Sequence, residues 1–80
     1  HYAIINAAAK IGGNCILNSK ALIEHDAFVE NHCHISTGAI VNGAVQIGDE
    51  TFLGSNATTA HCANIAKNSF IKAGSLEHGE

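Results

Sequence analysis

The stretch that decides the fold lies near the middle of the chain: residues 23–41 read IEHDAFVENHCHISTGAIV. Ile or Val begins this stretch and recurs at every sixth residue. The series extends toward both ends without a slip, and eleven of its twelve positions are aliphatic. These anchor positions are Ile5, Ile11, Leu17, Ile23, Val29, Ile35, Val41, Ile47, Leu53, Thr59, Ile65 and Ile71. An α-helix cannot hold such a series on one face, because successive members would rotate around its axis.

A second series follows four residues after each anchor and contains only small side chains. Its members are Ala9, Cys15, Ala21, Ala27, Cys33, Ala39, Val45, Thr51, Ala57, Ala63, Ser69 and Ser75. One aliphatic and one small residue in every six are typical of a parallel β-helix, in which each hexapeptide supplies a short strand and a turn. We therefore predict an all-β fold, a parallel β-helix of about four triangular 18-residue coils over residues 5–76, stacked roughly 4.8 Å apart.

Length and charge limit the organisation and the partners of the chain. Its 80 residues suffice for one small domain, residues 1–80, with a modest core, and this favours self-association. The net charge of −3, with four scattered lysines and no arginine, argues against nucleic acid or an anionic membrane as partner. The sequence shows no apolar run that would span a membrane and no signal peptide, so we expect a cytoplasmic protein with reduced cysteines. Residues 77–80 break the repeat and resemble vector-derived or designed sequence.

Aromatic residues stand directly before three of the anchors, where side chains are expected to point outward. These residues are Phe28, Phe52 and Phe70. Outward aromatic side chains on a narrow prism favour packing against a neighbouring prism. We therefore expect a homotrimer.

Histidines and acidic residues are concentrated in residues 18–39, beyond what a purely structural repeat needs. The segment Ile23-Glu24-His25-Asp26, followed by His34-Ile35-Ser36-x-Gly38-Ala39 and by residues 41–48, resembles bacterial hexapeptide-repeat sugar acetyltransferases. It is most similar to the group of sialic-acid O-acetyltransferases and UDP-amino-sugar N-acetyltransferases, and the resemblance covers about residues 5–76. It implies a left-handed coil, which the periodicity alone does not give, and acetyl-CoA as co-substrate.

The resemblance also implies roles for individual residues. His25 would be the general base, and the adjacent Asp26 would orient it; the family often has Glu there, and Glu24 is a second candidate. An imidazole is well suited to accept a proton from an amine or hydroxyl near neutral pH. Gly43 follows His25 by one coil, and its backbone N–H would face the thioester carbonyl as an oxyanion donor.

Four further residues complete the implied site. His34 falls on a position near the acetyl group of the cofactor and Asn18 on one near the acceptor. Lys67 and Lys72 are candidates to meet the phosphates of CoA, although solvated lysines are the simpler interpretation. Cys62 is expected to point outward but lies away from the motif, and we interpret it as a spectator thiol.

Two other functions compete with acetyl transfer. His25 and His61 have the spacing of one zinc-ligand pair in γ-class carbonic anhydrases, which share this prism, but Ala66 stands where the third ligand would fall, so we expect no metal. The family also carries an N-terminal α/β domain and a C-terminal extension, and the chain shows neither, which favours a truncated or engineered core. We predict an acetyl-CoA-dependent acyltransferase core acting on an amino or hydroxyl group of a sugar or sugar nucleotide. The alternative is a scaffold or oligomerisation module without activity.

Overall fold

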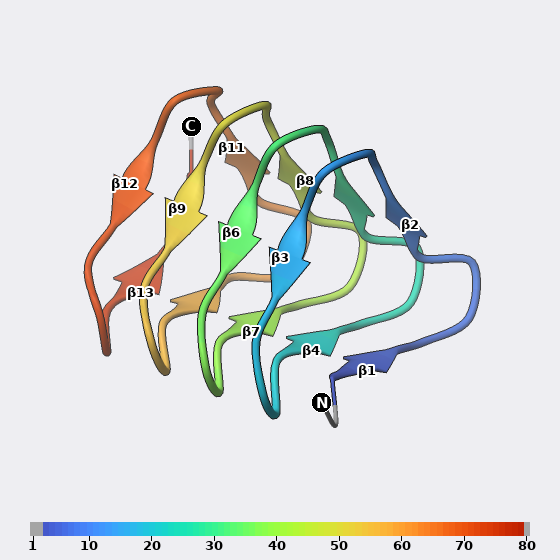
Figure 1. The fold of residues 1–80 in the computed structure, drawn as a ribbon, viewed down its shortest axis with the longest axis horizontal. Coiled ribbons are helices and arrows are strands. Elements are labelled where there is room, and N and C mark those ends of the chain that lie inside the picture. Colours follow the sequence, from blue (N-terminus) through green and yellow to red (C-terminus); the bar gives the residue numbers. More distant parts are fainter. Residues whose placement is uncertain (1–2, 80) are drawn as a thin grey trace.

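The computed structural model describes residues 3–79, and these form a stack of triangular coils (Figure 1). Within residues 3–79, thirteen two-residue strands make three parallel sheets, one on each side of the prism. Sheet A contains β1 (Ile4–Ile5), β4 (Leu22–Ile23), β7 (Ile40–Val41), β10 (Thr58–Thr59) and β13 (Leu76–Glu77). Sheet B contains β2 (Lys10–Ile11), β5 (Phe28–Val29), β8 (Gln46–Ile47) and β11 (Asn64–Ile65). Sheet C contains β3 (Ile16–Leu17), β6 (His34–Ile35), β9 (Phe52–Leu53) and β12 (Phe70–Ile71).

The coils are left-handed and keep one register throughout. In Figure 1 the chain descends along the front through sheet C, crosses the bottom through sheet A and rises at the back through sheet B, while the coils advance from right to left. Each strand pairs with the strand one coil away, so that Ile23 lies between Ile5 and Val41 in sheet A. The predicted all-β, left-handed parallel β-helix is confirmed, with about four coils of the predicted length.

Every corner of the prism is built by a sharp turn. One residue in each turn adopts a left-handed conformation; at the corner after β4 this residue is Asp26, with φ of 62°. The backbone N–H of Ala27 donates to the carbonyl oxygen of Glu24 and closes that turn. Between coils, the N–H of Glu24 donates to the oxygen of Val41. The residue just before the left-handed position, such as His25, therefore stands at an outer corner in every coil.

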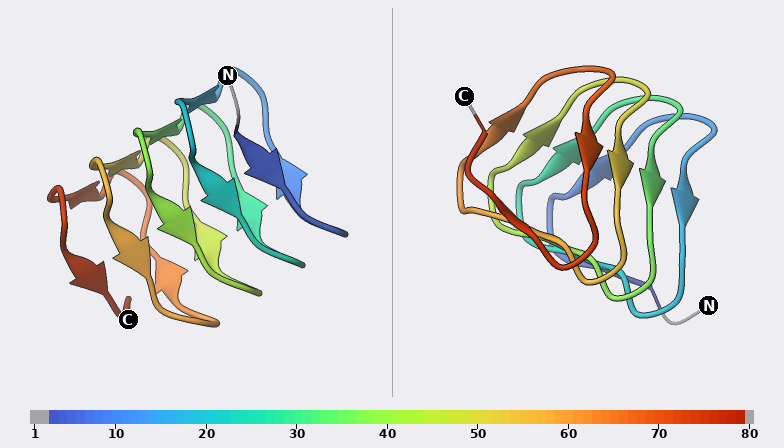
Figure 2. Two further views of the ribbon diagram at one scale, coloured as in Figure 1. Left: turned by 90° about the horizontal axis from the view of Figure 1, so that it is seen from below. Right: turned by 90° about the vertical axis from the view of Figure 1, so that its left-hand side faces the viewer.

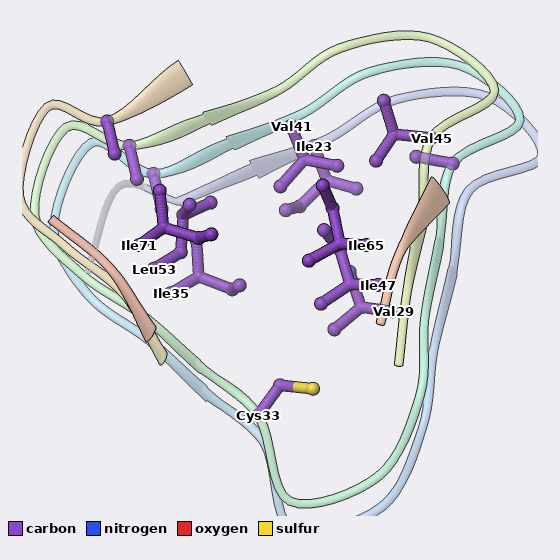
Figure 3. Close-up of a cluster of buried hydrophobic side chains, with 14 of the residues drawn as sticks. Ile23, Val29, Cys33, Ile35, Val41, Val45, Ile47, Leu53, Ile65 and Ile71 are labelled. Atoms are coloured by element: carbon purple, nitrogen blue, oxygen red, sulfur yellow. The ribbon is translucent and has the colours of Figure 1, made fainter. Parts of the chain in front are cut away.

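The anchor residues form the core, as the repeat predicts. Figure 3 shows Ile23 and Val41 from sheet A, Val29 and Ile47 from sheet B and Ile35 from sheet C pointing toward the axis of the prism. All five side chains are fully buried. The small series lies at the corners, where its side chains are buried through the middle coils. Because like residues stack, the core side chains of each coil also pack against those of the neighbouring coils.

The three outer faces of the prism differ in character, and the two views in Figure 2 show how they are placed. The outward residues of sheet A are Ile4, Leu22, Ile40, Thr58 and Leu76, and those of sheet C are Ile16, His34, Phe52 and Phe70. The outward residues of sheet B are Lys10, Phe28, Gln46 and Asn64. Sheets A and C therefore present apolar outer faces, and sheet B presents a largely polar one. Residues 3–79 contain no helix of the length and hydropathy that a membrane span needs.

Candidate active site

His25 and Asp26 form the first part of the candidate site, at the corner between sheets A and B. The Nδ1 atom of His25 lies 3.3 Å from Oδ2 of Asp26, and the two side chains are 59% and 63% exposed. The other acidic candidate, Glu24, is engaged elsewhere, because its Oε1 accepts a hydrogen bond from Asn6 at 2.7 Å. Asp26 is therefore the carboxylate that contacts the imidazole. It contacts Nδ1 and does not engage Nε2 of His25.

Gly43 occupies the same corner one coil further along the chain. A Cβ atom built on Gly43 would lie 2.8 Å from Nε2 of His25 and 3.1 Å from Cε1 of His61. Gly43 is not among the residues with positive φ, so its backbone conformation does not require glycine. The missing side chain instead makes room for two imidazole rings, and their nitrogen-bearing edges converge over this residue.

His61 also lies beside Gly43, and the sequence did not lead us to expect it at this site. Its ring centroid lies 6.3 Å from that of His25, with the two planes tilted by 53°. The signal was present in the sequence, since His25, Gly43 and His61 fall in one column of the repeat. The spacing of the two histidines pointed only to a metal pair, and within residues 3–79 no three or more His, Cys, Asp or Glu side chains gather into a metal-binding group.

The backbone N–H of Gly43 is a free donor beside these imidazoles. At the corner between sheets B and C, the N–H of Gly13 donates to Oδ1 of Asn31, and the N–H of Asn31 donates to Oδ1 of Asp49. Each of these donors is satisfied by a side chain one coil further along. The corresponding neighbour of Gly43 is His61, and within residues 3–79 the N–H of Gly43 forms no hydrogen bond, as is also the case for the equivalent N–H groups of His25 and His61. Gly43 differs from those two residues in being buried. A buried donor without a partner is costly unless a ligand or water satisfies it.

Asn18 and His34 form a second group, on a different part of the prism. Nδ2 of Asn18 donates to Nε2 of His34 over 3.1 Å, so a neutral His34 carries its proton on Nδ1. His34 packs edge-on against Phe52, and Phe52 stacks on Phe70, each with ring centroids 5.1 Å apart. Asn18 follows β3 at the corner between sheets C and A, and His34 lies in β6 on the outer face of sheet C. Within one chain, sheet A therefore separates this group from His25.

The two candidate lysines flank the last strand of sheet C. Lys67 and Lys72 are both exposed, in the turns before and after β12 (Phe70–Ile71). Phe70 stands between them with 70% of its side chain exposed. No pocket forms on the described part of a single chain. His25, Asp26, Lys67 and Lys72 are exposed, Asn18 and His34 are half-buried, and Gly43 is buried.

The cysteines take no part in either group. Cys15, Cys33 and Cys62 are all free, and Cys33 is buried. Its Sγ donates to the carbonyl oxygen of Gly48 at 3.2 Å. Desolvation by burial raises the pKa of the Cys33 thiol above its ordinary value, and the backbone N–H of Thr51 opposes this shift in part. A buried, protonated thiol is a small apolar side chain and not a nucleophile.

A solved structure shares the fold of this chain. No protein-family model matches the chain. The acetyltransferase domain of PglB from Neisseria gonorrhoeae FA1090 has a similar structure, with a TM-score of 0.71 and 20% sequence identity over 98% of this chain. The chain spans 50% of the length of that domain's chain. The expected likeness to hexapeptide-repeat acetyltransferases is therefore confirmed at the level of the fold.

Proposed function

We propose that the chain is the core of an acetyl-CoA-dependent acetyltransferase that acts on an amino or hydroxyl group of a sugar or sugar nucleotide. The observation that carries this proposal is the corner formed by His25, Asp26 and Gly43. One nitrogen of the imidazole faces a carboxylate, and the other faces the corner where a backbone N–H is free. A base and an oxyanion donor at one point are what acyl transfer to an amine or hydroxyl needs.

The reaction follows from this geometry without an acyl-enzyme. Nε2 of His25 accepts the proton of the acceptor group as that group attacks the carbonyl carbon of the thioester. Asp26 holds Nδ1 of the ring and stabilises the imidazolium that forms. The N–H of Gly43 donates to the oxygen that becomes negative in the tetrahedral intermediate.

Self-association belongs to the same proposal. The outer faces of sheets A and C are apolar, and one chain alone forms no pocket at the candidate site. In a homotrimer, face A of one chain would pack against face C of the next. This would bring Asn18 and His34 of a neighbouring chain toward His25, and would leave Lys67 and Lys72 beside the channel for the phosphates of CoA. The polar sheet B would remain in solvent.

Calorimetric titration with acetyl-CoA tests the proposal, on the parent chain and on His25→Ala and Gly43→Trp, with the solution mass measured in parallel. We expect saturable binding by a trimer, retained in His25→Ala and lost in Gly43→Trp. Release of CoA with a panel of amino sugars and UDP-amino sugars then identifies an acceptor. A folded parent chain that binds no acetyl-CoA would contradict the proposal and favour the scaffold.

A further inference from the structure

His25 and His61 are equivalent residues two coils apart, on either side of Gly43. Both occupy the corner position just before a left-handed residue, which is Asp26 in one coil and Cys62 in the other. Both rings approach the position that a Cβ of Gly43 would fill, and their centroids are 6.3 Å apart. Both side chains are exposed, so the arrangement does not serve to fill a core.

The two histidines differ in the residue beside them. His25 has the carboxylate of Asp26 at 3.3 Å from Nδ1. The equivalent neighbour of His61 is Cys62, which is not acidic. Only the ring on the His25 side of Gly43 therefore has a carboxylate that orients it, as the carboxylate of a general-base pair does. This asymmetry suits a base and an acid that act on one reacting group.

We propose that His61 is a second catalytic residue, the general acid that protonates the departing thiolate of CoA. The inference rests on the acetyl transfer proposed above. The acceptor's heteroatom forms a bond to the carbonyl carbon and loses its proton to Nε2 of His25. When the intermediate collapses, the carbon–sulfur bond breaks, and the sulfur takes the electron pair together with a proton from the imidazolium of His61. One proton enters at His25 and one leaves at His61, and exchange with solvent restores both exposed rings.

The placement of the two rings agrees with the positions of the bond that forms and the bond that breaks in that intermediate. Coils are spaced about 4.8 Å apart, and His25 and His61 lie one coil before and one coil after Gly43. The two rings would therefore reach a thioester carbonyl carbon held beside Gly43 from opposite sides along the prism axis. The attacking atom and the departing sulfur also lie on different sides of that carbon. Lys67 and Lys72 lie toward the C-terminal end, on the His61 side of Gly43, which is the side to which a CoA chain would leave.

The test compares two small thioesters that differ in their leaving thiol. S-acetyl-N-acetylcysteamine releases an alkyl thiolate that needs a proton, and S-(4-nitrophenyl) thioacetate releases a stable aryl thiolate that does not. Rates are measured with EDTA present, with the acceptor found for the parent chain or, failing one, with water. The variants are His61→Gln, His25→Gln and, as a control on the polar sheet, Asn64→Ala. Circular dichroism and solution mass verify that each variant is folded and assembled.

We expect His61→Gln to slow transfer from acetyl-CoA and from the alkyl thioester by about 100-fold or more, and from the aryl thioester by less than about tenfold. His25→Gln should slow both small thioesters alike, and Asn64→Ala neither. Equal effects of His61→Gln on the two thioesters, or no effect, would overturn the role of His61 while leaving the proposed function intact. A parent chain that consumes none of the three thioesters would overturn the proposed function, and this inference with it.

Discussion

A Cβ atom on residue 43 would lie 2.8 Å from Nε2 of His25, so Gly43 and this imidazole stand together only because Gly43 has no side chain. The neighbouring atoms are the far ends of flexible side chains, and the backbone of Gly43 has no left-handed φ. We therefore expect Gly43→Ala to change the free energy of unfolding by less than about 1 kcal/mol. The same substitution should shift the NMR signals of both His25 and His61 and weaken transfer from acetyl-CoA.

Gly48→Ala is the matched control for this prediction. A Cβ there would lie 2.5 Å from the backbone nitrogen of Lys67, which belongs to the next coil and cannot move aside cheaply. Overpacking against backbone should destabilise the fold by about 1–3 kcal/mol in urea denaturation, with little change in the His25 signals. Equal losses of stability in the two variants would show that Gly43 is a structural glycine.

Asp26→Asn should slow acetyl transfer while leaving acetyl-CoA binding unchanged. The carboxylate contacts Nδ1 of His25, and an amide in its place neither stabilises the imidazolium nor fixes the tautomer that leaves Nε2 free. We expect kcat/KM to fall by about 100-fold, with Asp26→Glu recovering part of the loss. Glu24→Gln is the control, because Glu24 bonds to Asn6. A larger loss in Glu24→Gln than in Asp26→Asn would reverse the assignment of the two carboxylates.

The period of the sequence predicted nearly all of the fold. A strict repeat of six fixes which residues point inward, and three repeats per coil place Ile23 beside Val41 and His25 beside Gly43. The repeat alone does not give the hand of the coil, because a right-handed prism would bury the same residues. That feature came from the resemblance to a family.

The candidate site was less accessible to sequence reasoning than the fold. The column of His25 and Gly43 followed from the repeat. The approach of the His61 ring to Gly43 depends on its side-chain rotamer, which a one-dimensional pattern does not contain. The bond from Asn6 that occupies Glu24 is likewise a matter of side-chain geometry. The separation of His34 from His25 follows from the three-sided coil, since the two residues belong to different sides of it.

The raised pKa of Cys33 predicts a loss of stability in alkaline solution. Burial disfavours the thiolate, so the folded chain holds this proton more tightly than the unfolded chain does. The stabilisation is complete below the pKa of the unfolded thiol, about 8.5, and is lost as the pH rises through the higher pKa of the folded state. Urea denaturation between pH 7.5 and 10 should therefore show a decline in the parent chain that is smaller in Cys33→Ala. Cys62→Ala, at an exposed position, should retain the decline of the parent chain; equal slopes in all three would contradict the prediction.

Substitutions of Phe70 and Phe28 distinguish assembly through sheet C from assembly through sheet B. Phe70 is 70% exposed on the apolar face of sheet C, where it stacks on Phe52, and Phe28 is 40% exposed on the largely polar face of sheet B. A buried carboxylate without a partner is strongly disfavoured at an apolar interface. In sedimentation equilibrium, Phe70→Glu should therefore convert the proposed trimer to monomer, whereas Phe28→Glu should remain a trimer. Because acetyl-CoA would bind where Asn18 and His34 of one chain approach His25 of the next, Phe70→Glu should also lose acetyl-CoA binding. Dissociation by Phe28→Glu, or a Phe70→Glu monomer that binds acetyl-CoA as tightly as the parent, would show that the site does not need the interface between sheets A and C.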